Sequence, residues 1–582
     1  MLYPQNNSCR RSWKLDGYWQ FRQDPQNIGR AEHWECGLKN SDVIAVPASW
    51  NEQKMDWYHY TGAAWYQRLE SLPELTGNQR VMLRFSSVQY TAEVYVNGKL
   101  AGINPRPYLP FEFDVTDLVS SGENRITLRV DGQVDLEEPV CIGDFYGYAG
   151  IARPVFFTIL DEKQIHDISV KTRLGKDSST AEITAYADKG LTIISQIDGT
   201  SVQLEEKDGI YSGSLFIKDA IWWDCENPHL YTLKTELRQG DKKLDEYSLS
   251  IGFREIEVCG REIRLNGKKT YLTGFGKHED FPVIGKGLCH ALNIRDFDTM
   301  KWCGGNSFRT SHYPYSEEIL DLADQQGFLV IDETPFIGLN GDKLGNEVTR
   351  AKALEYMKLL IDRDKNHPSV ISWSIGNECD SDASQAEGFF LPVIELAKQL
   401  DSRPITYVAW TKPEEDKVYP HVDIVGMNRY YGWYPYENWP GSAKPGDLDT
   451  AMIQMEECLE SFARLFSAPI IVTEFGADTI EGMHSPFLLQ FTEEFQSEFL
   501  ERYIKLIRSK PYTAGMHIWA FADFNTSQNP RRVMGNRKGL FTRIREPKMA
   551  AHTVRKLWTG KSGIGLTSLK EDPNTPDFHV PE

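Results

Sequence analysis

The sequence lacks paired cysteines, an excess of basic residues and long apolar runs, and each absence excludes a class of protein. Its nine cysteines are odd in number and scattered, and none form a CxxC pair. This argues against a disulfide scaffold or a zinc ribbon and favours a reducing compartment. The net charge of −19 excludes nucleic acid as an expected partner, because a groove that follows phosphates needs an excess of Lys and Arg.

The chain also has no segment typical of export or of a membrane span. The N-terminal stretch MLYPQNNSCRRSWKLDG contains no apolar region of the signal-peptide kind. No apolar run approaches the ~18 residues that cross a bilayer. We therefore expect a cytoplasmic protein without a membrane partner.

Aromatic side chains are abundant, at 12% of 582 residues. Aromatic rings stack on the apolar faces of sugars, but β-strands also favour aromatic residues, so composition alone leaves both explanations open. The acidic net charge would not attract an anionic substrate from a distance. Any such substrate must be bound by a few local cations.

The first part of the chain, residues 1–162, predicts a jelly-roll β-sandwich. Apolar and polar residues alternate in short runs, such as 80–85 (RVMLRF), 92–96 (AEVYV) and 125–130 (RITLRV), and Asn97-Gly98 is typical of a tight hairpin turn. Residues 163–256 repeat the pattern on a smaller scale, with runs at 165–172, 181–187 and 230–237. About 90 residues of this kind suit an immunoglobulin-like β-sandwich.

The last part, residues 257–582, predicts a TIM (β/α)8 barrel. Short buried strands alternate with amphipathic stretches, and residues 316–326 (SEEILDLADQQ) predict a helix that Ser316 caps and Gly327 ends. Eight such strands indicate a barrel of parallel strands. We expect them at residues 271–276, 307–312, 328–334, 370–377, 405–410, 422–428, 469–474 and 516–521.

Two glutamates stand at the ends of the predicted strands four and seven, Glu378 and Glu474. Reactive side chains of TIM barrels stand at these C-terminal ends. Cleavage of a glycosidic bond requires one protonated carboxyl for the leaving oxygen and one ionised carboxylate for the anomeric carbon, ~5–5.5 Å apart in a retaining enzyme. Repulsion between them raises one pKa, which keeps the acid protonated near neutral pH. A single glutamate there would more often pair with an arginine; two favour catalysis.

Two segments resemble the signatures of glycoside hydrolase family 2. One is 364–370 (DKNHPSV) leading to Asn377-Glu378, and the other is 306–314 (NSFRTSHYP). The resemblance covers nearly the whole chain, since family members consist of a sandwich, an immunoglobulin-like domain and a barrel. It implies Glu378 as general acid/base, Glu474 as covalent nucleophile and Asn377 as a partner of the sugar 2-hydroxyl. For the β-glucuronidase branch it implies neither a metal nor an organic cofactor.

Family membership leaves the sugar open, and the segment after the last strand narrows it. A glucuronide carries a carboxylate at C5, which needs paired donors when it is buried. In the segment 531–539 (RRVMGNRKG), Asn536 and Lys538 resemble the uronate-recognition motif of β-glucuronidases, and Arg532 is similar to a sugar-contacting arginine there. The alternative interpretation of this segment is a basic surface loop.

Further residues match sugar-contacting positions of the same branch. The segment 428–434 (NRYYGWY) resembles one whose asparagine and last tyrosine, here Asn428 and Tyr434, approach the uronate. His278 resembles a histidine that contacts the sugar, and Trp519 a tryptophan of the pocket floor. Asp144 resembles an acid that reaches from the sandwich into the barrel mouth and accepts a sugar hydroxyl.

The sequence thus predicts a retaining hydrolase of terminal β-D-glucuronides, either small molecules or oligosaccharides. A β-galacturonidase or β-galactosidase on the same scaffold stays open, as does a carbohydrate-binding protein without catalysis. Some β-glucuronidases carry a longer insertion after the third strand than residues 336–349 (FIGLNGDKLGNEVT), so we expect an open aglycone side. The resemblance also suggests a homo-oligomer, either a dimer or a tetramer.

Overall fold

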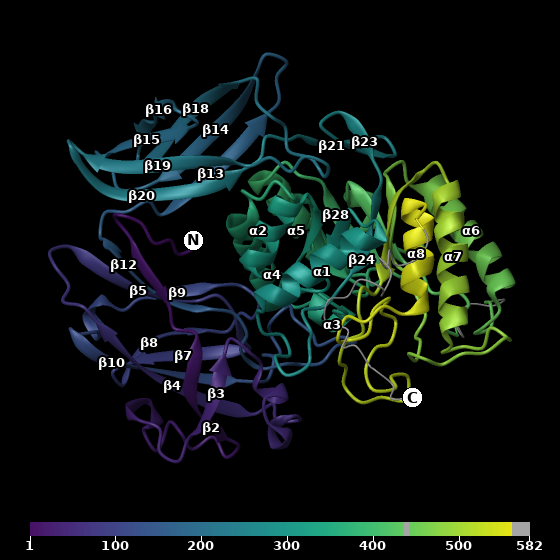
Figure 1. Ribbon diagram of the computed structural model, residues 1–582, viewed down its shortest axis with the longest axis horizontal. Helices are drawn as coiled ribbons and strands as arrows, with labels where there is room; N and C mark the ends of the chain where they lie inside the picture. The colour runs from purple at the N-terminus through teal and green to yellow at the C-terminus, as the bar shows by residue number, and fades with distance from the viewer. Residues whose placement is uncertain (436–441, 562–582) are drawn as a thin grey trace, which may run out of the picture.

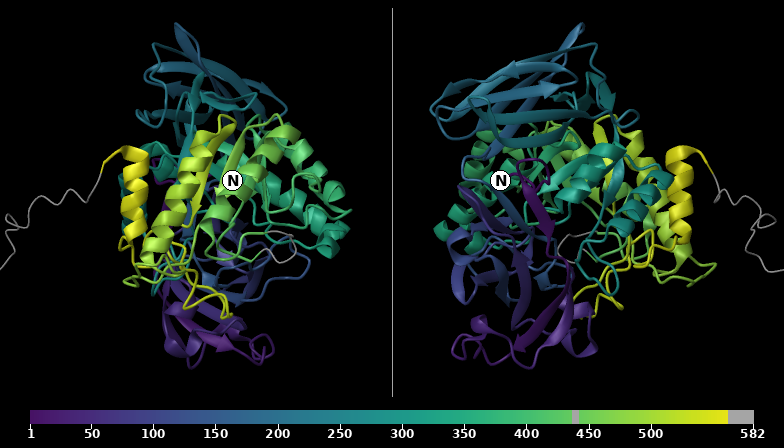
Figure 2. Two further views of the ribbon diagram at one scale, coloured as in Figure 1. Left: turned by 90° about the vertical axis from the view of Figure 1, so that its right-hand side faces the viewer. Right: turned by 60° about the vertical axis from the view of Figure 1, so that its left-hand side comes forward.

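The computed structural model describes residues 1–435 and 442–561, which pass through two β-sandwiches into a closed barrel (Figure 1). The two sandwiches lie one above the other against the same flank of the barrel (Figures 1 and 2). This order of domains confirms the predicted fold class. The domain bounds 1–162, 163–256 and 257–582 stay predictions, and residues 436–441 and 562–582 of the last range lie outside the described part.

The first sandwich is built from strands whose apolar residues point inward. Its strands are β1 (Arg11–Lys14), β2 (Gly17–Asp24), β3 (Asp42–Val46), β4 (Ala63–Leu72), β5 (Gln79–Phe85), β6 (Val88–Gln89), β7 (Thr91–Val96), β8 (Lys99–Asn104), β9 (Phe111–Asp114), β10 (Gly122–Asp131), β11 (Gly150–Ile151) and β12 (Val155–Asp161). A sheet in the order β3-β2-β4-β10-β7-β8 faces one in the order β1-β12-β5-β9. Asn97 and Gly98 both have positive φ, at 51° and 79°, which confirms the predicted turn between β7 and β8.

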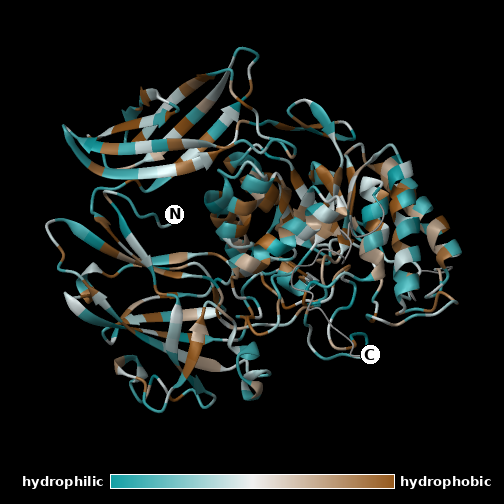
Figure 3. Cartoon of the chain, viewed as in Figure 1, coloured by the Kyte–Doolittle hydropathy of each residue, from teal (hydrophilic) through white to brown (hydrophobic). Residues whose placement is uncertain are grey.

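The second sandwich shows the alternation most clearly, as brown and teal along its strands in Figure 3. Its two four-stranded sheets have the orders β13-β14-β18-β17 and β16-β15-β19-β20. The strands are β13 (Asp167–Arg173), β14 (Ser178–Tyr186), β15 (Thr192–Ile197), β16 (Thr200–Gln203), β17 (Glu205–Lys207), β18 (Ile210–Lys218), β19 (Tyr231–Gln239) and β20 (Lys242–Ile251). Along β14 every second residue is buried, as a sheet with one inward face requires.

Eight parallel strands close the barrel in sequence order. They are β24 (Leu272–Gly276), β25 (Ser307–Arg309), β26 (Leu329–Glu333), β27 (Val370–Asn377), β28 (Ile405–Ala409), β29 (Ile424–Asn428), β30 (Ile470–Glu474) and β31 (Thr513–Trp519). A three-stranded sheet precedes the barrel in the chain and covers the end of the barrel at which the strands begin. It consists of β21 (Ile256–Cys259), β22 (Glu262–Leu265) and β23 (Lys268–Thr270). Ile263 and Leu265 of β22 pack there against Leu272, Leu329 and Ile424, which open their strands. The other end, at which the strands finish, is the barrel mouth, and polar residues line it.

Helices cover the outside of the barrel between most strands (Figure 1). They are α1 (His290–Cys303), α2 (Glu317–Gln326), α3 (Gly341–Leu344), α4 (Glu347–Asp364), α5 (Ala386–Leu400), α6 (Leu448–Leu465), α7 (Glu493–Ser509) and α8 (Met549–Thr559). Between β28 and β29 the connection is only the 3-10 turn η5 (Tyr419–His421). Ser316 accepts a hydrogen bond from Ile319 N at the start of α2, and Gly327 ends the helix in the left-handed conformation, as predicted.

Two predicted strands need correction, and one short helix was not predicted. The strand expected at 307–312 ends at Arg309, because the backbone turns directly after it, where Tyr313 N–H donates to Thr310 O at 2.9 Å. The last strand was expected at 516–521, but β31 runs from Thr513 to Trp519 because Gly515–Trp519 pair in register with the whole of β24. Within the segment 336–349, Asn340 caps the one-turn helix α3, which the sequence pattern does not indicate. Pairing with β24 therefore determines where β31 begins and ends, and the Asn340 cap determines where α3 begins.

Candidate active site

The barrel mouth brings Glu378 and Glu474 together from the ends of β27 and β30. Glu474 is the last residue of β30 and is 4% exposed. Glu378 follows β27 with a positive φ of 51°, while its N–H donates to Val408 O at 2.8 Å. Such a backbone conformation is unfavourable for a glutamate, and strained residues of this kind recur at active sites.

Glu474 accepts hydrogen bonds from two neighbouring strand ends. The Arg309 guanidinium of β25 donates Nη2–H to Oε1, and the Tyr430 hydroxyl donates to Oε2 at 2.6 Å. Arg309 also binds Glu333 at 2.7 and 2.8 Å. Burial would raise the pKa of Glu333, but Arg309 overcomes that effect and holds it at about 2. The guanidinium therefore faces two acids, and one of them is permanently ionised.

Glu378 has a weaker set of donors. Asn428 Nδ2 donates to its Oε1 at 2.7 Å, while Thr473 donates to Asn428 Oδ1 at 2.9 Å. We expected Asn428 beside the uronate, but its side chain lies against Glu378 and Asn377 (3.3 Å). Asn377 in turn accepts from Arg309 at 3.3 Å, so both carboxyl groups belong to one polar network.

Both carboxyl groups have a raised proton affinity, mainly because both are buried. Burial raises the pKa of Glu474 to about 8; the charge of Arg309 opposes that rise and the charge of Glu378 adds to it. Burial also raises the pKa of Glu378. Such a pair carries one proton between them across neutral pH. The raised value belongs to the pair; within the pair Glu474 accepts from the charged Arg309 and Glu378 only from the neutral amide of Asn428, so we assign the shared proton to Glu378.

His278 and Trp519 form an aromatic floor beside this pair. Their rings lie 5.4 Å apart, and Trp519 stacks on His312 at 4.9 Å. Burial lowers the pKa of His278 well below its ordinary value, so the ring is neutral. Its Nδ1 contacts the Tyr313 hydroxyl at 3.0 Å, while its buried Nε2 has no hydrogen-bond partner within the described residues. A buried nitrogen of this kind needs a partner, and a sugar hydroxyl would supply one.

A second group of polar residues stands next to the carboxyl pair, and we call it the rim cluster. Its members are Asp144, Tyr434, Asp478, Arg532, Asn536 and Lys538. Arg532 Nε donates to Asp144 at 2.9 and 2.7 Å, and Asn536 Nδ2 donates to the same carboxylate at 2.9 Å. The Tyr434 hydroxyl lies 2.6 Å from Arg532 Nη2 and 2.7 Å from Lys538 Nζ.

The structure thus joins Asp144 of the first sandwich to the segment after β31, although 388 residues separate Asp144 from Arg532. The side chain of Asp144 is 41% exposed, whereas those of Arg532 and Lys538 are 8% and 1% exposed. A carboxylate already occupies the donors of Arg532 and Asn536. These donors therefore have the geometry to hold a carboxylate or a hydroxyl of a ligand.

Sequence reasoning did not assign roles to three residues of the site: Arg309, Tyr430 and Asp478. Arg309 ends β25, inside one of the two family signatures, and Tyr430 follows β29 by two residues. Both positions meet the rule that barrel strand ends carry the chemistry, which could have identified them. Asp478 lies four residues beyond Glu474 in an irregular segment, where no pattern pointed to it.

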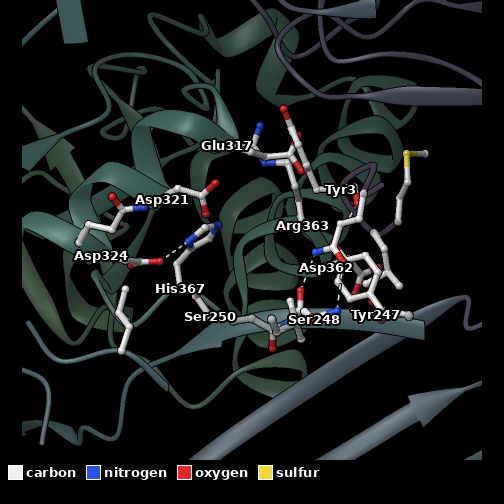
Figure 4. Close-up of a pocket in the computed structure, with 18 residues that line it drawn as sticks. Tyr3, Tyr247, Ser248, Ser250, Glu317, Asp321, Asp324, Asp362, Arg363 and His367 are labelled. Carbon is white, nitrogen blue, oxygen red and sulfur yellow. Dashed lines mark hydrogen bonds and ion pairs between the residues drawn. The ribbon is translucent and has the colours of Figure 1, made fainter. Parts of the chain in front are cut away.

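A separate cavity of about 220 Å³ lies away from the mouth, between the N-terminal segment, β20 and the outer face of α2 (Figure 4). Asp321, Asp324 and His367 come together there. The His367 ring and Asp324 pair at 2.6 Å, and Asp324 also accepts from Ser369 N at 2.9 Å. These contacts tie α2 to the segment before β27, so the group has a structural explanation.

Comparisons with known proteins agree with this architecture. Three family models match: "Glycosyl hydrolases family 2, sugar binding domain" over residues 13–160, "Glycosyl hydrolases family 2" over 151–254, and "Glycosyl hydrolases family 2, TIM barrel domain" over 256–561. A β-glucuronidase of Paenibacillus borealis is 37% identical over 96% of this chain and 98% of its own length, and the human β-glucuronidase is 35% identical over 96% and 92%.

Solved structures extend the likeness to the whole fold. The crystal structure of the Ruminococcus gnavus β-glucuronidase has a TM-score of 0.90 and 32% identity, with 97% of this chain and 99% of that chain covered. A β-D-glucuronidase of Dictyoglomus thermophilum has a TM-score of 0.87 and 39% identity, with 96% and 99% covered. Matches of this length and identity show that the chain belongs to glycoside hydrolase family 2.

Proposed function

We propose that the chain hydrolyses terminal β-D-glucuronides by double displacement, with retention at the anomeric carbon. The observation that carries this proposal is the pairing of two unlike carboxyl groups, Glu378 and Glu474, directly beside a cluster of cations and amides. The first feature suits glycosidic bond cleavage, and the second suits a substrate carboxylate. The relatives named above are β-glucuronidases.

In the first step, the Glu378 carboxyl donates its proton to the glycosidic oxygen while a Glu474 oxygen attacks the anomeric carbon. The bond to the leaving oxygen breaks, the aglycone departs as an alcohol, and a glycosyl ester forms on Glu474. Arg309 and Tyr430 keep Glu474 ionised for this attack. In the second step, the Glu378 carboxylate removes a proton from water, which attacks the same carbon and releases glucuronic acid with Glu474 ionised again.

The floor and network residues orient the sugar ring in this proposal. The Nε2 of His278 has the free hydrogen-bonding capacity for a hydroxyl, and the Trp519 ring supplies an apolar surface. Asn377 would hydrogen-bond the 2-hydroxyl, a contact that strengthens as positive charge develops at the anomeric carbon. Asn428 would act first through Glu378, which it contacts.

The rim cluster would bind the uronate. Lys538 Nζ and the Tyr434 hydroxyl lie 2.7 Å apart, and Asn536 and Arg532 present further donors. In the free site Asp144 accepts from Arg532 and Asn536, so a substrate would redirect these donors while Asp144 accepts a sugar hydroxyl. The Ruminococcus gnavus relative has been solved with uronic isofagomine and with D-glucaro-1,5-lactone, ligands whose names denote the same acid group.

A comparison of three substrates tests the proposed function. Turnover of p-nitrophenyl β-glucuronide should exceed that of the β-galacturonide and the β-galactoside. Lys538→Ala should raise KM for the glucuronide about 10–100-fold, because one partner of a buried ion pair is removed. Galactoside turnover that dominates and survives Lys538→Ala unchanged would establish a neutral-sugar hydrolase instead. Binding of glucuronides without any turnover would establish a carbohydrate-binding protein.

We further propose an open aglycone side, since the segment between β26 and α4 is short and holds only α3. An open side should admit large leaving groups. Rates on a small aryl glucuronide and on a uronic-acid oligosaccharide should then be of similar size. A strong preference for the small substrate would contradict an open site.

We also propose a cytoplasmic homo-oligomer, either a dimer or a tetramer. All nine cysteines are free thiols, which supports a reducing compartment. Among residues 1–435 and 442–561, no helix has both the length and the apolar character to span a membrane. Cell fractionation tests the location, and light scattering on the purified protein distinguishes a dimer or tetramer from a monomer.

A further inference from the structure

The rim cluster contains one acid that no sugar-contacting role explains. Asp478 is 2% exposed and lies in the segment after β30. Its Oδ2 accepts from Lys538 Nζ at 2.5 Å and from Arg532 Nη1 at 3.3 Å, while its Oδ1 accepts from Arg537 N at 2.9 Å. Within the described part of the chain, the hydrogen bonds of this carboxylate therefore go to the segment after β31.

The charges of the cluster show why a buried acid belongs there. Arg532 and Lys538 carry two positive charges, and Asp144 and Asp478 carry two negative ones. Burial would raise the pKa of Asp478, but Lys538 and Arg532 together lower it, so the acid is ionised. Without it, the buried Lys538 ammonium would lack a carboxylate partner among the described residues, and an unpaired buried charge is costly.

The two acids of the cluster differ in how firmly they are held. The side chain of Asp144 is 41% exposed and comes from another domain, whereas that of Asp478 is 3% exposed and carries three hydrogen bonds. A substrate carboxylate that enters the cluster would compete with Asp144, since both would accept from Arg532 and Asn536. Asp478 would keep its contact with Lys538 Nζ and so hold the ammonium in place for the ligand.

We propose that Asp478 is a positioning residue that makes the site select an acidic sugar, because it fixes Lys538 and Arg532 in place for the uronate. This inference rests on the proposed function. Asp478 touches neither the reacting carbon nor the leaving oxygen, so its effect appears in binding and in the choice of sugar. Its position beside the nucleophile strand also couples the uronate site to Glu474 through only four residues of chain.

The test is Asp478→Asn, which keeps the shape of the side chain and removes its charge. KM for p-nitrophenyl β-glucuronide should rise at least about tenfold while kcat changes less than about threefold. The ratio of kcat/KM for the glucuronide over the β-glucoside should fall at least about tenfold. A purely structural role would lower kcat/KM for both sugars by the same factor and would overturn the proposal.

Asp523→Asn is the matched control. Asp523 is likewise a buried acid of the neighbouring segment, where it accepts from Lys548 Nζ at 2.7 Å and from Gly539 N at 2.9 Å, and it has no contact with the rim cluster among the described residues. The Asp523→Asn substitution should lower the midpoint of thermal unfolding. It should not change the ratio of kcat/KM for the glucuronide over the β-glucoside. A change in the ratio equal to that of Asp478→Asn would overturn the proposal.

A double-substitution cycle covers the case in which Asp478→Asn folds poorly. Lys538→Met with Asp478→Asn removes both buried charges at once, and Lys538→Met alone is its reference. If Asp478 acts through Lys538 and Arg532, adding Asp478→Asn to the Lys538→Met protein should raise KM clearly less than it does in the wild-type protein, by about threefold at most. A further tenfold rise in KM would overturn the proposal. Wild-type protein that does not turn over the glucuronide would instead overturn the proposed function itself.

Discussion

The two halves of the site are built in different ways. The carboxyl pair and its partners Arg309 and Tyr430 stand at or just beyond the ends of barrel strands, and the guanidinium of Arg309 is fully buried. The rim cluster is assembled from irregular segments of two domains, and its Asp144 side chain is 41% exposed. A rigid half performs the chemistry in our proposal, while a half made of loops chooses the sugar. Substitutions in the two halves should therefore change different kinetic constants.

The largest effect is expected for Glu474→Gln. Loss of the nucleophile should lower kcat about 10⁴-fold or more with every sugar, because the covalent step disappears. Stopped and continuous assays with p-nitrophenyl β-glucuronide measure it. Asp321→Asn, which changes a carboxylate of the cavity in Figure 4, is the control and should leave kcat unchanged. Residual activity above a thousandth of wild type would assign the nucleophile elsewhere.

Glu378→Gln should have a smaller effect that depends on the leaving group. A proton donor contributes about 10²–10⁴-fold, but a nitrophenolate leaves without a proton. The loss in the first step should therefore be large for a methyl or phenyl glucuronide and small for a dinitrophenyl glucuronide. Equal losses for all three leaving groups would remove Glu378 from the role of acid.

Two tyrosines give the sharpest comparison, because each half of the site contains one. Tyr430 donates to Glu474 at 2.6 Å, and the Tyr434 hydroxyl lies 2.7 Å from Lys538 Nζ. Tyr430→Phe should lower kcat about 10–100-fold, since a charge-assisted hydrogen bond to the nucleophile is lost. Tyr434→Phe should mainly raise KM, by about 3–10-fold. A Tyr434→Phe variant with reduced kcat and unchanged KM would contradict the proposal that the rim cluster acts in binding and the carboxyl pair in catalysis.

The smallest effect concerns stability. Burial raises the pKa of Glu474 to about 8 and also raises that of Glu378, above the ordinary value near 4.3, so the folded pair binds its shared proton more tightly than the unfolded chain does. Stability is then lost as pH rises from about 4.3 through 8. Glu474→Gln removes one acid of the pair and its repulsion with Glu378, so it should stabilise the protein by about 1 kcal/mol more at pH 8 than at pH 5. Thermal unfolding at pH 5 and pH 8 measures it; an equal gain at both would contradict the assignment.

The sequence predicts the rigid half well, because strand periodicity fixes where each barrel strand ends. Glu378 and Glu474 lie where the eight-strand pattern puts them, and Arg309 stands in the same pattern at the end of β25. The bonds among them were not predictable. Whether Asn428 turns to Glu378 or to the uronate depends on side-chain rotamers and on Thr473, and no periodicity encodes either.

The rim cluster is harder to predict from the sequence than the carboxyl pair. Asn536 and Lys538 drew attention only through a resemblance, and Asp478 drew none. The contact between Asp144 and Arg532 depends on how the sandwich docks on the barrel, and docking is decided by many packed residues at once. Short-range patterns describe elements, and this contact joins two domains.

That contact has a consequence for how sugar choice could change. Asp144 reaches the mouth because the first sandwich docks on the barrel. Any substitution that tilts this sandwich would therefore move Asp144 relative to Arg532. Preference among substrates would thus respond to mutations far from the sugar, along the seam between the domains. A proteolytic cut between the two domains would leave both carboxyl groups in place. It should therefore reduce the selectivity among sugars more than the rate of hydrolysis.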